Sequence, residues 1–307
     1  MRGDLIGGVK RAWGLRPKTS RQRKPSCVRK PHVITYRATL DVPCELVRFV
    51  SRLLAAERHR RGTRRGTRAL TCWFQAVLVL RWFRERASVA ALGRDLKVSQ
   101  ATAYRYLDEA VGVLADIAPD LREALEYAHR VGLSHVVLDG MVIATDRVRA
   151  KTTSVKGQEI DVWYSGKHHH HGANIQFLTA PDGYPLWVSE VRPGSVHDLN
   201  AARELALPAL YHAATRGLPT LADKGYEGAG IGIHTPTREP SSGHGLATGN
   251  RAHNMLLIRL RCLGERAAAL LTQRWRTLQH ITVSPNKIGD ITKAALALTH
   301  FEYHRPC

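Results

Sequence analysis

The hydrophobic periodicity of the chain changes near residue 131, and this change constrains the fold more than any other feature. Before it, apolar residues recur at helical spacing, first over residues 41–58 and last over 121–132. After it come short apolar runs typical of strands: "HVVLDGMVIAT", "EIDVWYSG", "IQFLT" and "LWVSEV", the last two joined by the hairpin turn "APDGYP". We therefore expect an all-α domain over residues 41–130, followed by an α/β domain with a mixed sheet over 131–303.

A helix-turn-helix pattern lies within the first domain. A short amphipathic helix around Leu92 is followed by "LKVS" and by a second helix, "SQATAYRYLDEAVGVL", with Ser99 as its N-cap. In such motifs the start of the second helix meets base edges and phosphates, so Ser99, Gln100, Thr102 and Arg105 are candidate DNA contacts. The alternative is an ordinary helical hairpin in a small bundle.

The charge of the chain favours nucleic acid as its partner. The 46 Lys and Arg residues outnumber the 26 Asp and Glu residues by 20, and a field of that sign attracts phosphate backbones. Residues 1–40 predict a flexible basic arm, with a merely solvated tail as the alternative. No run approaches the about 20 apolar residues of a membrane-spanning helix, and five scattered cysteines without a CxxC pair indicate neither a zinc knuckle nor a disulfide framework.

Three acidic residues stand where they invite a functional explanation. Asp139 is a lone acid within the apolar strand "HVVLDGMVIAT", where an unpaired charge is costly. Asp223 ends the strand "PTLAD", and Glu265 is the one acid on an arginine-rich helix that runs from about 250 to 277. The alternatives are a structural ion pair for Asp139, a cap or turn for Asp223, and a local salt bridge for Glu265.

Taken together, these acids suit metal-dependent phosphoryl transfer. Carboxylate oxygens are hard ligands that hold Mg²⁺ or Mn²⁺. Two such ions can serve an in-line displacement at phosphorus, one at the attacking and one at the leaving oxygen. On the same helix, Arg261 and Arg266 are candidate contacts to the DNA phosphates.

The chain resembles a known family at several motifs. "LDGMVIAT", "YSGKHHHHGANIQFLTAPDGYPLWVSEVRPGSVHDLNA", "LADKGYEG" and "HNMLLIRLRCLGERAAALLTQRWRTL" are similar to the DDE domain of bacterial insertion-sequence transposases, in the branch related to Harbinger-type transposases. The resemblance spans roughly residues 45 to 303. It implies an RNase H-like fold, with Asp139, Asp223 and Glu265 as the three metal-binding acids.

The resemblance also bears on neighbouring residues. It implies that His197 and Asp198 lie near the site, without giving them a definite function. Lys167 begins "KHHHH", which we interpret as a DNA-contacting loop, with a solvated turn as the alternative. The sequence departs from the family pattern at Gly264, where valine is more usual. Glu265 follows Asp223 by 42 positions (265 − 223), which leaves no room for a large insertion domain.

The sequence therefore predicts a DNA transposase. It would bind the terminal inverted repeats of its element in double-stranded DNA, hydrolyse a phosphodiester with two divalent ions, and transfer the freed strand to target DNA. Because two ends must be handled together, we expect a homodimer or higher assembly on DNA, in the bacterial cytoplasm at the nucleoid and not at a membrane. The alternatives are a non-catalytic DNA-binding relic or repressor, and a metal-dependent endonuclease without strand transfer.

Overall fold

The structure is a computed structural model that describes residues 39–153, 157–240 and 245–304. The chain divides into two compact units, residues 1–39 and 40–307. The predicted basic arm over residues 1–40 therefore lies almost entirely outside the described residues. All elements named below belong to the second unit.

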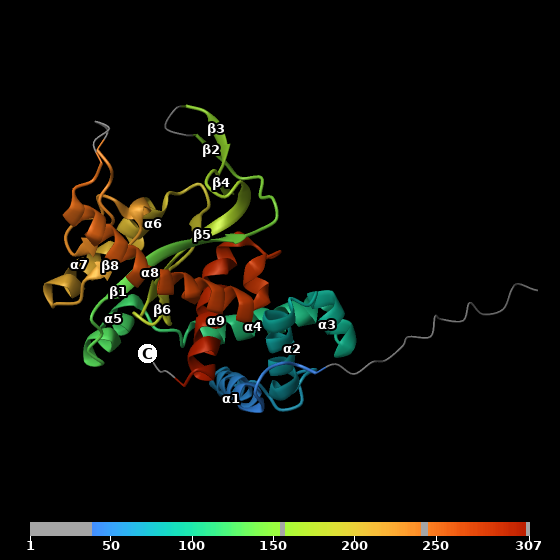
Figure 1. Cartoon of the computed structure of the whole chain (residues 1–307). Coiled ribbons are helices and arrows are strands. Elements are labelled where there is room, and N and C mark those ends of the chain that lie inside the picture. The colour runs from blue at the N-terminus through green and yellow to red at the C-terminus, as the bar shows by residue number, and fades with distance from the viewer. Residues whose placement is uncertain (1–38, 154–156, 241–244, 305–307) are drawn as a thin grey trace, which may run out of the picture. The chain divides into compact units, whose positions relative to one another are not determined.

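Between residue 39 and the sheet, the structure has five helices (Figure 1). They are α1 (Cys44–Arg60), α2 (Cys72–Glu85), α3 (Val89–Asp95), α4 (Gln100–Ala115) and α5 (Leu121–Arg130). Local sequence sets where three of them begin, because the side chains of Thr71, Ser99 and Asp120 each accept a hydrogen bond from a backbone N–H in the first turn. The predicted N-cap at Ser99 is confirmed.

Seven strands form one mixed sheet, and a separate hairpin projects from it (Figure 1). The central path is β4-β5-β1-β8-β9, and β6 and β7 also pair with β5. Strands β1 and β5 are antiparallel, whereas β8 is parallel to both β1 and β9. The strands of this sheet are β1 (Val136–Ala144), β4 (Tyr164–Ser165), β5 (His170–Thr179), β6 (Pro185–Val188), β7 (Arg192–Pro193), β8 (Thr220–Leu221) and β9 (Ile233–His234), and the hairpin is β2 (Lys151–Thr153) with β3 (Glu159–Asp161).

Helices cover both faces of the sheet. On one face, Leu138 and Leu178 belong to a core shared with α5, α6 and α7. On the other, Ile175 and Phe177 belong to a core shared with α8 and α9. The remaining helical elements are α6 (Asp198–Leu205), α7 (Leu207–Thr215), η1 (Lys224–Tyr226), α8 (Thr248–Arg274), η2 (Arg276–Gln279), η3 (Pro285–Lys287) and α9 (Ile288–Glu302).

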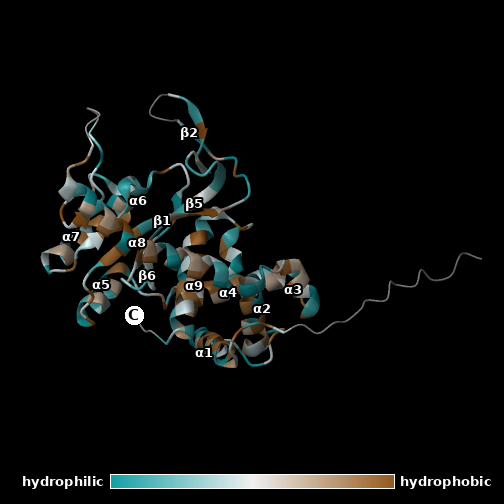
Figure 2. Ribbon diagram, in the orientation of Figure 1, coloured by the Kyte–Doolittle hydropathy of each residue, from teal (hydrophilic) through white to brown (hydrophobic). Residues whose placement is uncertain are grey.

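The N-terminal helices α1 to α4 pack onto the C-terminal end of the chain. The second core contains their apolar residues together with those of α9, and Figure 2 shows hydrophobic and hydrophilic residues alternating along α4 and α9. Phe49 of α1 stacks on Phe301 of α9 with ring centroids 4.2 Å apart. Lys287 donates to Asp108 of α4 at 2.7 Å. The helical segment and the sheet segment thus share one continuous core.

The mixed α/β architecture predicted from the sequence is confirmed, and it is consistent with an RNase H-like DDE domain. The turn between β5 and β6 occurs at "APDGYP", as expected. The helix-turn-helix DNA-binding domain stays a prediction. The same holds for the domain boundaries between residues 40 and 41 and between residues 130 and 131. Over the described ranges, no helix is both long and apolar enough to cross a membrane.

Candidate active site

Asp139 and Asp223 occupy equivalent positions on neighbouring strands. The parallel register pairs Val136 with Thr220 and Val137 with Leu221. Two residues beyond these pairs come Asp139, still within β1, and Asp223, which follows the end of β8 and is the N-cap of η1 with an extended backbone. Because residues two apart in an extended backbone share a face, both acids lie on the side of Val137 and Leu221. The structure therefore brings together the two aspartates that the sequence singled out.

Helix α8 covers this side of the strand ends. Leu257 of α8 packs with Val137 and Leu221 in a small apolar cluster. One added Cβ at Gly264 would lie 3.0 Å from Val137, so the glycine lets the helix approach β1 closely. Between these two contacts, Arg261 interacts electrostatically with Asp139, and its buried Nε has no hydrogen-bond partner within the described residues.

The surroundings of Asp139 disfavour its charge. The pKa of this carboxyl is raised to about 6, chiefly by burial and also by the negative charges of Asp223 and Asp198, against the opposing effects of the Gly140 N–H and Arg261. The Gly140 N–H donates to Asp139 Oδ1 at 2.8 Å. A cation placed beside the two aspartates would relieve this electrostatic cost.

Asp198, at the start of α6, lies on the opposite side of β1. A Cβ added at Gly140 would lie 2.7 Å from Asp198 Oδ1, and Gly140 faces away from the side that Asp139 occupies because successive residues alternate. Asn174 Nδ2 donates to Asp198 Oδ1 at 2.8 Å, and Lys167 Nζ donates to Asp198 Oδ2 at 3.0 Å. Asp198 lies close enough to Asp139 for its negative charge to raise the pKa of the Asp139 carboxyl. The neighbouring His197 is the N-cap of α6, its Nδ1 accepting from the Leu199 N–H at 3.3 Å.

Three buried polar residues beside Asp198 were not anticipated from the sequence. Gln176 Nε2 donates to Asn174 Oδ1 at 2.9 Å, and the Tyr226 hydroxyl donates to Gln176 Oε1 at 2.6 Å. The pKa of Tyr226 is raised well above its ordinary value by burial and by the charges of Asp198, Asp139 and Asp223. The only signal for Asn174 and Gln176 was the alternation of polar residues within the otherwise apolar "ANIQF".

Glu265 is exposed on α8 and follows Arg261 by four residues, one helical turn. Arg266 is exposed beside it. In the described part of the chain, no three His, Cys, Asp or Glu side chains already stand where they could hold one metal ion. The assignment of Glu265 as the third acid stays a prediction.

The donor chemistry of the paired aspartates nevertheless fits a divalent cation. Both offer carboxylate oxygens, which are the ligands that Mg²⁺ and Mn²⁺ prefer. Asp223 Oδ1 accepts from the Gly225 N–H at 2.7 Å, which fixes the carboxylate at the start of η1. Lys224, next in the chain, is exposed. Asp139 and Asp223 are therefore the residues that would hold such an ion.

The predicted DNA contacts on α4 surround its first turn. Gln100 and Arg105 are exposed, whereas the Ser99 and Thr102 hydroxyls lie 2.9 Å from each other, and Ser99 Oγ accepts from the Thr102 N–H at 3.2 Å. Helix α3 approaches this turn closely, because a Cβ at Gly93 would lie 3.1 Å from the Val98 carbonyl oxygen. Gly93 thus lets α3 and α4 pack closely at this turn.

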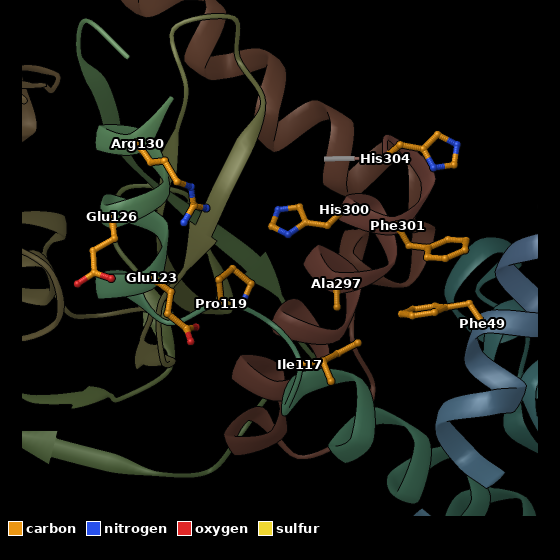
Figure 3. Close-up of a pocket in the computed structure, with 10 residues that line it drawn as sticks. All are labelled: Phe49, Ile117, Pro119, Glu123, Glu126, Arg130, Ala297, His300, Phe301 and His304. Carbon is orange, nitrogen blue, oxygen red and sulfur yellow. The ribbon is translucent and has the colours of Figure 1, made fainter. Parts of the chain in front are cut away.

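A hollow in the surface is lined by none of the three predicted metal-binding acids. It has a volume of about 750 Å³ and lies between α1, the segment before α5, α5 itself and α9. Figure 3 shows Glu123, Glu126 and Arg130 on one side of it and Phe49 with Phe301 on the other. None of the predicted site residues lines it, so we do not assign the chemistry to this hollow.

Comparison with known proteins identifies the family. A model described as "DDE superfamily endonuclease" matches residues 138–300, more than half of the 307-residue chain. The chain belongs to the DDE superfamily endonucleases. The matched range contains Asp139, Asp223 and Glu265, and it begins one residue before the first of them. Membership of this family supports a transposase-like nuclease that acts on DNA.

No curated protein matches the sequence. Among solved structures, a "Crystal structure of a pre-cleavage Mos1 transpososome" is similar at 12% sequence identity, over 87% of this chain and 99% of that chain, with a TM-score of 0.19. A TM-score this low does not show a shared fold.

Proposed function

We propose that this DDE superfamily endonuclease is a DNA transposase. It binds the terminal inverted repeats of its element, hydrolyses a phosphodiester at the element's end, and joins the freed 3′-hydroxyl to target DNA. The observation that carries the proposal is the equivalent placement of Asp139 in β1 and Asp223 just after β8, each two residues past the paired positions Val137 and Leu221, inside the region matched by the family model. We further propose, from the resemblance to bacterial insertion-sequence transposases, that the protein acts in the bacterial cytoplasm, at the nucleoid.

The site would work with two divalent ions, Mg²⁺ or Mn²⁺. Asp139 and Asp223 hold them, and Glu265 completes the set as the third acid, from a position one turn beyond Arg261 on α8. When bound, such ions activate the attacking oxygen and neutralise the leaving one. Arg261 supplies a fixed positive charge beside Asp139, where the phosphate of the substrate would lie.

The helical segment supplies DNA binding in this proposal. The exposed side chains of Gln100 and Arg105 on α4 would reach into the major groove, and the capping residues Ser99 and Thr102 would contact the backbone. Arg94 and Lys97 are exposed around the same turn and add positive charge. Near the active site, Lys167, Arg261 and Arg266 would contact the phosphates flanking the cut.

The first experiment tests the chemistry. The full chain is incubated with Mg²⁺ or Mn²⁺ and a labelled duplex that carries the repeats flanking its own gene, together with a supercoiled target plasmid. Asp139→Asn, Asp223→Asn and Glu265→Gln are compared with Asp290→Asn, which alters an exposed acid on α9. We expect cutting and joining in the wild type and in Asp290→Asn, and neither in the three site variants.

The other outcomes select between the alternatives. Cutting without joined products would identify an endonuclease without strand transfer. Sequence-specific binding with no metal-dependent cutting would leave a DNA-binding relic. Full activity of Glu265→Gln, with Asp139→Asn and Asp223→Asn inactive, would remove Glu265 from the site and retain the pair of aspartates.

A second experiment tests the helix-turn-helix. Arg105→Ala and Gln100→Ala are expected to weaken binding to the repeat by about 1–3 kcal/mol each and to relax its sequence preference. Unchanged binding in both would exclude α4 as the reading helix. Light scattering of the complex tests the homodimer or higher assembly, which a complex of one protein copy with one duplex would contradict.

A further inference from the structure

Both carboxylate oxygens of Asp198 are already engaged by side chains. Oδ1 accepts from Asn174 Nδ2 at 2.8 Å, and Oδ2 accepts from Lys167 Nζ at 3.0 Å. Its side chain is only 13% exposed, whereas that of Lys167 is 63% exposed. The Lys167 ammonium group, held by Asp198, is therefore exposed to solvent, whereas the Asp198 carboxylate oxygens face the interior.

A chain of buried hydrogen bonds fixes Asp198 from below. The Tyr226 hydroxyl donates to Gln176, and Gln176 donates to Asn174, at 2.6 and 2.9 Å. Asn174 Nδ2 also donates to the Val196 carbonyl oxygen at 3.1 Å, just before α6. Tyr226 and Gln176 are fully buried, and Asn174 is 2% exposed. Buried polar groups that are all satisfied form a rigid network.

Gly140 provides the space that this arrangement needs. A Cβ at this position would lie 2.7 Å from Asp198 Oδ1 and 3.0 Å from Gln176 Nε2. Any other residue would push the carboxylate or the amide away. The position of Asp198 is thus set from three sides, by Asn174, by Gly140 and by Lys167.

The backbone around Lys167 is also well defined. Strands β4 and β5 pair Ser165 with His170, so Lys167 lies in the tight turn between them. The His169 N–H donates to the Ser165 carbonyl oxygen at 2.8 Å, and His169 has a φ of 56°. This accounts for the first part of the "KHHHH" stretch, because Lys167 to His169 form the turn and the next two histidines begin β5.

The charge of Lys167 acts on the whole acidic cluster. Partial burial lowers the pKa of Lys167, but Asp198, and then Asp223 and Asp139, favour the ammonium form, and the net effect raises the pKa. An ammonium carries three N–H donors. Within the described residues, Lys167 donates one of them, to Asp198, which leaves two for a ligand at the acidic cluster.

We propose that Asp198 is the anchor of Lys167 and not a cation ligand, and that the anchored ammonium binds a non-bridging oxygen of the DNA phosphodiester held at Asp139 and Asp223. The inference rests on the proposed function, because it takes the same substrate at the same site. Lys167 contacts the substrate, whereas Asp198, Asn174, Gln176 and Tyr226 are positioning residues that act through it. The chemistry needed is that of a phosphodiester, which a lysine contacts as a point charge.

The test uses Lys167→Gln, Asp198→Asn, the double variant and Tyr226→Phe in the full chain. Lys293→Gln is the matched control, because it removes a lysine that pairs with Glu190 on a different part of the structure. Mn²⁺ binding is measured by calorimetry without DNA. We expect Asp198→Asn and Lys167→Gln to stay within about threefold of the wild type, because neither residue is a ligand. Asp139→Asn is expected to weaken Mn²⁺ binding by at least about tenfold.

DNA binding and cleavage give the second and third readouts. Lys167→Gln should reduce the dependence of log affinity on log salt concentration by about 1. Asp198→Asn should lower kcat about tenfold without raising KM, because the ammonium is kept but no longer held in place. The double variant should cleave no more slowly than Lys167→Gln alone, since one side chain acts through the other. Tyr226→Phe should lower kcat as Asp198→Asn does, but by a smaller factor. Lys293→Gln should match the wild type in every readout.

Several results would overturn the inference. Loss of Mn²⁺ binding in Asp198→Asn, as large as in Asp139→Asn, would make Asp198 a cation ligand. Additive effects on kcat in the double variant would separate Asp198 from Lys167. If Lys167→Gln left the salt dependence of DNA affinity unchanged, Lys167 would not contact a phosphate. This measurement needs no DNA cleavage. By contrast, a wild type that binds neither Mn²⁺ nor the repeat would overturn the proposed function itself.

Discussion

Replacing Asp139 by asparagine should stabilise the protein and inactivate it at the same time. The pKa of this carboxyl is about 6 in the folded chain against an ordinary value of 3.8, chiefly because burial disfavours its charge. A pKa difference of about 2 units corresponds to about 3 kcal/mol. Asparagine keeps the oxygen that accepts from the Gly140 N–H but carries no charge, so the electrostatic cost disappears.

The effect of Asp139 on the free energy of unfolding depends on pH, because the pKa of its carboxyl differs between the folded and the unfolded chain. Below pH 3.8 the carboxyl is protonated in both the folded and the unfolded chain, and it costs nothing. As the pH rises through about 6, the folded chain must also ionise it, and the wild type loses up to about 3 kcal/mol of stability that Asp139→Asn retains. The variant should therefore melt about 5 °C higher than the wild type at pH 8 in EDTA, and with a much smaller difference near pH 4.

Thermal and urea unfolding across pH 4–8 would measure this effect. Asp290→Asn, at an exposed acid, is the control and should change stability by less than about 0.5 kcal/mol at every pH. Excess Mg²⁺ should narrow the difference at pH 8, because the ion stabilises the wild type by binding only its folded form. A variant that is less stable than the wild type at pH 8, or a difference that is the same at pH 4 and pH 8, would refute a buried, repelled charge at Asp139.

Three further substitutions have expected outcomes from the close contacts of the fold. Gly140→Ala should displace Asp198 and slow cleavage by about tenfold, with little effect on Mn²⁺ binding, as calorimetry and a cleavage assay would show. Gly183→Ala should cost at least about 2 kcal/mol in urea unfolding, because its φ is 80° and a Cβ would lie 2.2 Å from the Leu263 carbonyl oxygen. Trp275→Phe should cost about 2 kcal/mol, because a fully buried side chain loses volume and a 2.8 Å hydrogen bond to α9.

The sequence was informative where local rules decide the structure. Apolar runs predicted the strand that carries Asp139 and the strand that ends two residues before Asp223, and a hydroxyl before an apolar helix predicted the N-cap at Ser99. The parallel register of β1 with β8 was not predictable, because it depends on contacts between residues about 84 positions apart in the chain (220 − 136). That register is what makes the two acids neighbours.

Long-range packing limited the rest of the sequence analysis. The stacking of Phe49 on Phe301 and the ion pair between Lys287 and Asp108 leave no trace in periodicity, so the shared core of α1–α4 with α9 was not foreseen. Asn174 and Gln176 were overlooked for a related reason. Polar residues that alternate along a strand usually face water. Only the three-dimensional structure shows that Asn174 donates a hydrogen bond to Asp198 and that Gln176 accepts one from Tyr226.

The adjacent residues Asp139 and Gly140 link the two halves of the candidate site. Because side chains alternate along a strand, Asp139 lies on the side of Asp223 and α8, while Gly140 opens the other side to Asp198 and the buried amides. Under the proposals above, one dipeptide thus sets both the cation site and the position of the Lys167 ammonium. Changes at the two positions should therefore be separable: Asp139→Asn should weaken Mn²⁺ binding by at least about tenfold with Lys167 still anchored, and Gly140→Ala should release Lys167 with little effect on Mn²⁺ binding.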